Sequence, residues 1–82
     1  MHTIKTVCQK KFEHSLEVIA IVKAKDWYIG IDLPKPLILE EDFIVCRWHD
    51  FHDGEKSNIE GRTTIAICRN YDDASTLWLR HV

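Results

Sequence analysis

Hydrophobic and polar positions alternate over much of this 82-residue chain, a pattern that predicts β-strands. The strongest signal comes from residues 43–49 and 63–69, two apolar segments rich in β-branched side chains. A polar run with Asp, Gly, Lys, Ser and Asn separates them, which is typical of a long antiparallel hairpin. We therefore expect residues 43–69 to form the centre of a small β domain.

Residues 16–24 have the same alternation. Leu16, Val18, Ala20 and Val22 share one parity. A helix is the competing interpretation, but β-branched side chains lose rotamer freedom on a helix and fit a pleated surface better. Ile19 and Ile21 interrupt the polar parity, so we expect this strand to be partly covered on its second face as well.

Further segments complete a set of six predicted strands in two meanders. Pro34 and Pro36 indicate an extended crossover between the meanders, because proline donates no backbone hydrogen bond to a sheet. The pattern predicts a mainly β fold in a single domain over residues 1–82, either a six-stranded antiparallel barrel or a two-layer sandwich. The expected strands are 3–12, 16–24, 27–32, 43–49, 63–69 and 75–82.

The segment 37–48 leaves a second interpretation open. Pro36 could begin a helix that Gly54 ends, although the run from Phe43 to Cys46 lacks a 3.6-residue apolar stripe. We favour a strand here. The alternative fold is an α+β domain with one helix, at 37–50 or 14–25, packed on an antiparallel sheet. The connection 50–61 is expected to be a long polar loop, the kind of segment that often carries function.

The charges are unevenly distributed along the chain. The formal net charge is -2 and the isoelectric point is near 6.2. Residues 26–60 contain nine acidic and three basic side chains. This balance argues against bulk phosphate binding and suits a basic protein partner.

The cysteines and the hydropathy pattern bear on compartment and chemistry. Three cysteines, with neither a signal sequence nor an 18-residue apolar window, predict free thiols in the cytoplasm and no membrane partner. No phosphate loop, dinucleotide fingerprint or nucleophile elbow is present, so we expect a non-enzymatic protein without a cofactor. Cys8 or Cys68 could act as a nucleophile with His49 as its base only if the fold brings the two side chains together.

A cluster of potential metal ligands lies within eight residues. Zinc binds cysteine sulfur, histidine nitrogen and carboxylate oxygen, and Cys46, His49 and His52 supply the first two types. On a strand, however, Cys46 and His49 point to opposite faces. We therefore keep a zinc-binding domain as an alternative and favour a polar strand end.

Arginine and aromatic side chains are frequent in binding hot spots, and here they adjoin the acidic loop. We expect a binding or regulatory protein that contacts another protein, such as an inhibitor or modulator of a larger protein of phage or mobile-element type, with a homodimer also open. The expected contact residues are Arg47, Trp48, Asp50, Phe51, Asp53 and Glu55. The alternative is a nucleic-acid-binding barrel that uses Lys5, Lys10, Lys11, Lys23 and Lys25 of the first hairpin.

Overall fold

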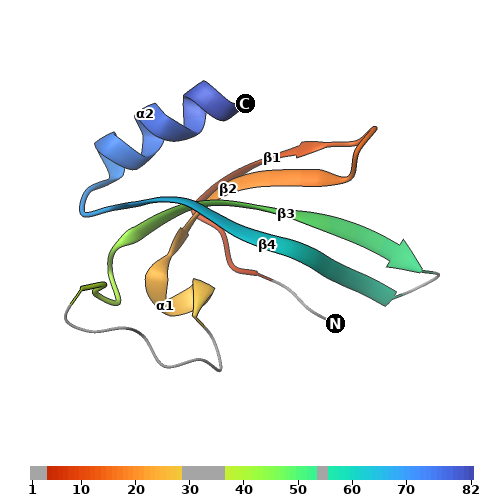
Figure 1. Ribbon diagram of the computed structural model, residues 1–82, viewed down its shortest axis with the longest axis horizontal. Coiled ribbons are helices and arrows are strands. Elements are labelled where there is room, and N and C mark those ends of the chain that lie inside the picture. Colours follow the sequence, from red (N-terminus) through yellow and green to blue (C-terminus); the bar gives the residue numbers. More distant parts are fainter. Residues whose placement is uncertain (1–3, 29–36, 54–55) are drawn as a thin grey trace.

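The chain folds into a four-stranded antiparallel sheet with two helices (Figure 1). This computed structural model describes residues 4–28, 37–53 and 56–82. The strands lie in the sheet in their chain order, so each strand pairs with the strand that follows it in the sequence. The elements in order are β1 (Cys8–Phe12), β2 (Glu17–Lys23), α1 (Ala24–Trp27), β3 (Phe43–Asp53), β4 (Lys56–Cys68) and α2 (Tyr71–His81).

The mainly β prediction is confirmed, and the α+β alternative fits the described residues. Their four strands form an open sheet and do not close into the expected six-stranded barrel. The packed helix is α2 and lies in neither expected place, because most of 14–25 and 37–50 is occupied by β2 and β3. The predicted strand 27–32 is not confirmed: Trp27 ends α1, and residues 29–36 lie outside the described part.

The predicted strand 75–82 is wrong, because this segment belongs to α2. Asn70 caps the helix, and its side-chain oxygen accepts the backbone N–H of Asp73 at 2.9 Å. Ala74, Leu77 and Trp78 then recur at helical spacing and pack against the sheet. The capping signal and the apolar stripe together outweigh the two-residue alternation at the end of the chain.

The predicted hairpin is confirmed and is longer than expected. β3 continues to Asp53 and β4 begins at Lys56, so the expected loop 50–61 is largely strand. The polar side chains there are compatible with pairing because many of them are exposed on the sheet surface. Two register shifts interrupt the β3–β4 ladder, and Gly61 supplies the positive φ of 67° near one of them.

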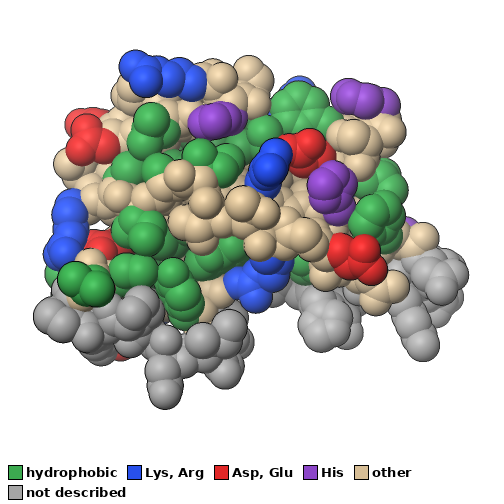
Figure 2. All heavy atoms as spheres, in the orientation of Figure 1, with side chains coloured by type: hydrophobic (Ala, Val, Ile, Leu, Met, Phe, Trp, Pro, Cys, Tyr) green, Lys and Arg blue, Asp and Glu red, His purple; other side chains and the backbone are tan. Residues whose placement is uncertain are grey.

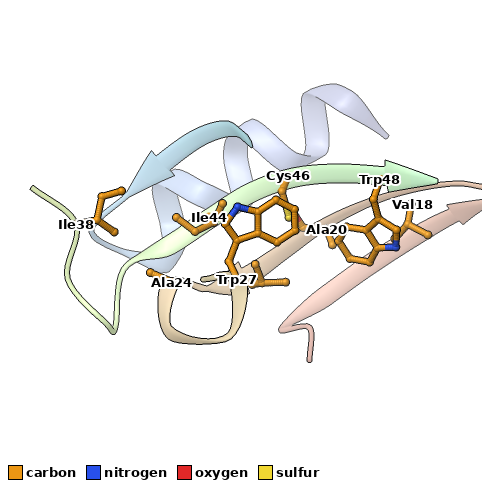
Figure 3. Close-up of a cluster of buried hydrophobic side chains, with 9 residues drawn as sticks. Val18, Ala20, Ala24, Trp27, Ile38, Ile44, Cys46 and Trp48 are labelled. Atoms are coloured by element: carbon orange, nitrogen blue, oxygen red, sulfur yellow. The ribbon is translucent and has the colours of Figure 1, made fainter. Parts of the chain in front are cut away.

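Each face of the sheet has its own core. On the face that α2 covers, here called the helix face, Ile21 of β2 and Val45 of β3 pack with Ala74. Burial of Ile21 confirms that β2 is covered on both sides. On the opposite face, Trp27 and Trp48 lie with ring centroids 6.0 Å apart over the small side chains of β2 and β3 (Figure 3).

Two indole groups attach the helices to the sheet. The Nε1 of Trp78 in α2 donates to the carbonyl of Ile19 at 2.8 Å. The Nε1 of Trp27 in α1 donates to Oγ1 of Thr64 in β4 at 3.1 Å. The Arg62 guanidinium lies 4.2 Å from the Trp27 ring centroid and donates to the Trp27 carbonyl. These contacts join segments far apart in sequence.

A buried carboxylate holds the turn that leads into β3. The Asp42 side chain accepts the backbone N–H of Leu39 at 2.8 Å and lies 3.5 Å from Nε of Arg69. Asp42 is only 3% exposed, so its polar atoms depend on these partners. Ile38 in the same segment closes one end of the core on the face opposite α2.

Replacing Asp42 by Ala should lower the free energy of unfolding by about 1–3 kcal/mol, because the Leu39 N–H loses its acceptor and Arg69 loses the carboxylate beside it. Urea denaturation measures the change. Glu13→Ala, which removes an exposed carboxylate from the β1–β2 turn, is the control and should leave the midpoint nearly unchanged. Equal midpoints for the two variants would contradict the structural role of Asp42.

Candidate functional site

The alternation of side chains along β3 divides the predicted contact residues between two faces. β3 runs without interruption from Phe43 to Asp53, so Arg47, His49 and Phe51 lie on the helix face with Val45. Trp48 lies on the opposite face. The expected surface therefore does not form as one unit.

Trp48 is 4% exposed and belongs to the core on the face opposite α2. A partner cannot reach its ring in this fold, so we remove Trp48 from the contact surface. Asp50 is half-buried on the same face, 3.7 Å from Nζ of Lys11 and 4.0 Å from Nε2 of His52. Glu55 and the side chain of Asp53 lie outside the described residues.

The remaining residues form what we call the hairpin face: Arg47, His49 and Phe51 on β3 with Asn58 and Glu60 on β4. Phe51 pairs with Asn58, and His49 pairs with Glu60. Phe51 is 38% exposed and stacks on His49, with ring centroids 6.0 Å apart and an interplanar angle of 17°. A stacked aromatic pair with an exposed phenyl ring is thus held on a strand that pairs with β4.

The hairpin face stays open because its neighbours end before it does. β2 begins at Glu17, which pairs with His49, so the end of β3 extends past β2 (Figure 1). Carboxylates flank His49 on both sides, from Glu17 on β2 and Glu60 on β4. Figure 2 shows histidine side chains beside acidic and basic groups over this part of the sheet. The surface is therefore mixed in charge.

A groove adjoins the hairpin face where the last turn of α2 meets the sheet. Its volume is about 320 Å³. Arg47 lies in it with Glu17 from β2 and His81 from α2. Ile19, Thr63, Thr64 and Ile65 complete the lining.

We found no significant match of this chain to a known protein family, a curated protein or a solved structure. Its function is therefore inferred from its own side chains. Neither helix in the described residues has the length and apolar character needed to cross a membrane.

The structure does not bring the expected metal ligands together. The Cys46 side chain lies in the core, where its thiol donates to the Ala20 carbonyl at 3.7 Å. His49 is on the helix face, and His52 is beside Asp50. Among residues 4–28, 37–53 and 56–82, no three histidine, cysteine, aspartate or glutamate side chains are grouped to hold a metal ion.

The three thiols are in environments that disfavour the nucleophilic thiolate. Burial raises the pKa of Cys8 and of Cys68, and it raises the pKa of Cys46 to about 12. Nucleophile activation requires the opposite shift. Cys8 and Cys68 lie in the core beneath α2, and the structure shows no contact of either described thiol with His49.

The five lysines of the nucleic-acid alternative do not form one patch. Lys10 and Lys11 are adjacent on β1 and point to opposite faces, and Lys11 approaches Asp50. Lys23 and Lys25 each lie 3.1 Å from Glu41, and their hydrogen bonds lower the pKa of that carboxyl. Lys5 is exposed near the start of the described chain.

The acidic segment is likewise partly neutralised within the protein. Glu41 bridges two lysines, Asp42 is buried in a turn beside Arg69, and Asp50 approaches Lys11. These acids are therefore not available as a continuous track for a basic partner. Of the three acids expected at the contact, Asp50 is the one whose side chain is described, so the contact of these acids with a basic partner stays a prediction.

Two features of the site were missed at the level of sequence. His49 was considered as a metal ligand and as a partner for a cysteine nucleophile, but not as a contact residue, although it alternates in phase with Arg47 and Phe51 along the strand and so shares their face. No pattern in the sequence indicated that Glu17 and His81 line the groove with Arg47, because α2 and β2 come together only in the folded chain.

The thiols should differ in reactivity. Iodoacetamide at mildly alkaline pH should modify half-buried Cys8 first and leave Cys46 unmodified, because Cys46 is buried and its pKa is near 12. Peptide mass spectrometry after timed labelling measures the order. In guanidinium chloride all three should react at similar rates. Rapid labelling of Cys46 in the folded protein would contradict its placement.

Stability should also depend on pH through Cys46. Its pKa rises from 9.0 to about 12 on folding, so its contribution is complete below pH 9 and is lost as pH rises toward 12. In urea titrations above pH 9, the free energy of unfolding should therefore fall more steeply for the natural chain than for Cys46→Ala. If the free energy of unfolding of the two proteins depends on pH in the same way, the raised pKa of Cys46 is contradicted.

Proposed function

We propose that this chain is a small non-enzymatic protein that binds a larger protein through the hairpin face. The exposed Phe51 ring, stacked on His49 and in line with Arg47, carries the proposal. Aromatic and arginine side chains supply much of the energy at protein interfaces. The β3–β4 ladder holds the backbone beneath them, which lowers the entropy lost on binding.

Regulation or inhibition of the larger protein is the role that we favour. Of the residues expected to make the contact, Arg47 and Phe51 are exposed on the hairpin face and support binding, which such a role requires. The free thiols of Cys8, Cys46 and Cys68 fit a reducing compartment such as the cytoplasm.

Nucleic acid is less favoured as the partner, although aromatic rings on a sheet can stack on bases. Glu17 and Glu60 flank the His49–Phe51 stack and would repel a phosphate backbone. The five lysines are also divided between faces and partly paired with acids. Nucleic acid remains an outcome that the experiment below can detect.

Self-association by edge pairing is also not favoured. β4 forms one edge of the sheet, but its ladder has two register irregularities, which distort an edge and hinder strand addition. β1 at the other edge has only five residues. Light scattering on the purified chain distinguishes a monomer from a homodimer.

Photo-cross-linking can identify the partner. The chain with p-benzoylphenylalanine in place of Phe51 is expressed in the source cells, irradiated, and its adducts are identified by mass spectrometry. We expect a protein adduct. An adduct with nucleic acid alone would overturn the proposal.

Affinity for that partner should fall at least about tenfold in Phe51→Ser, because a central aromatic contact is lost. Leu79→Ser is the matched control: Leu79 is 61% exposed on α2, away from the hairpin face, and its replacement should leave the affinity unchanged. Urea denaturation verifies that both variants fold. A folded Phe51→Ser variant with full affinity would refute the proposed surface.

A further inference from the structure

Arg47 is the basic group of the hairpin face, and the described residues leave it available for a partner. Arg62 lies over the Trp27 ring, and Arg69 is beside Asp42. The Arg47 guanidinium is exposed, and no residue of the described chain forms an ion pair or hydrogen bond with it. Its five N–H donors therefore face the groove without a fixed acceptor.

The groove has the size and position to receive part of a partner chain. Its volume of about 320 Å³ is at the lower limit of small-molecule sites, which suits one or two side chains. Arg47 lies in the sheet between Ile19 of β2 and Thr63 of β4. His81 in the last turn of α2 lines the same groove.

The negative groups around Arg47 determine where an anion can bind. Glu17 lies on the β2 side, and the last turn of α2 presents the negative end of its dipole. The β4 side, at Thr63, is therefore the favourable approach. Several closely spaced phosphates would meet Glu17 and Glu60, whereas one carboxylate would not. This arrangement selects a single anionic side chain.

We infer that the groove binds an aspartate or glutamate side chain of the protein partner, with Arg47 as a bidentate donor on the Thr63 side. The inference rests on the proposed function, because Phe51 and His49 supply the second contact, to an aromatic side chain. Arg47 and Phe51 are four residues apart, or about 13 Å along a strand. An extended partner segment would therefore carry its acid and its aromatic residue four positions apart.

Two synthetic peptides test this chemistry directly. The probe is acetyl-Ser-Glu-Thr-Ser-Thr-Trp-Ser-amide, and the matched peptide has Gln in place of Glu. Titration of the isotopically labelled chain, followed by amide chemical shifts, should show binding of the Glu peptide with shifts at residues 46–48 and 62–64. The Gln peptide should bind about fivefold more weakly.

Variants separate a specific contact from general charge attraction. Arg47→Gln should weaken the Glu peptide about fivefold and abolish the difference between the two peptides. Arg47→Lys should recover only part of the affinity, because lysine lacks the planar fork. Arg80→Gln removes the same charge from the exposed end of α2 and should change the affinity less than about twofold.

The inference is overturned if the Glu and Gln peptides bind alike, if neither shifts the named amides, or if Arg47→Gln and Arg80→Gln have equal effects. Its failure is distinct from failure of the proposed function. If Phe51→Ser no longer binds the cross-linked partner while Arg47→Gln still binds it, the hairpin face is supported as the binding surface and the acidic side chain in the groove is excluded. If Phe51→Ser keeps the partner, the proposed function falls.

Discussion

The side-chain alternation of β3 is the constraint on which both the core and the surface depend. Eleven consecutive residues are extended, so each side chain points away from its neighbours. In the first half, both faces are covered, and Ile44 and Val45 are fully buried. Past Arg47 the helix face is more open, and the same alternation leaves His49 half-buried and Phe51 exposed. One strand thus connects the interior with the candidate binding site.

The position of α2 decides where coverage ends. Trp78 packs on the sheet and donates to the Ile19 carbonyl, which sets the last turn of α2 above the middle of β2 and β3. The groove with Arg47 lies at that end of the helix. The position of this helix therefore determines which part of the helix face is covered.

The charged residues divide into structural and available groups, and this division changes the functional interpretation. The acidic balance of residues 26–60 suggested a basic partner, but the fold pairs Glu41 with two lysines and buries Asp42. Cys46, expected as a zinc ligand, lies in the core on the face opposite His49, and burial raises the pKa of all three thiols. The site that remains is defined by one exposed arginine and a stacked aromatic pair.

Local pattern predicted the elements whose signals are strong over many residues. β2 and the β3–β4 hairpin are examples. A strand buried on two faces has a long run of apolar residues, and β-branched side chains within that run favour the extended backbone. The C-terminal segment was wrongly predicted as a strand. Leu77 and Leu79 share one strand parity, which competes with the helical spacing of Ala74, Leu77 and Trp78, and the Asn70 cap was not considered. The hairpin extends through polar residues because backbone pairing does not depend on apolar side chains when the surface is exposed.

The amino-acid sequence by itself determined the β-rich character, the central hairpin and the parity that groups Arg47 with Phe51. These depend on neighbours along the chain, whose spacing can be read directly. Only the tertiary structure decided that Trp48 is buried, that the acids are paired, and that α2 and β2 complete a groove around Arg47. Those facts depend on contacts between residues distant in sequence, and local patterns contain no information about them.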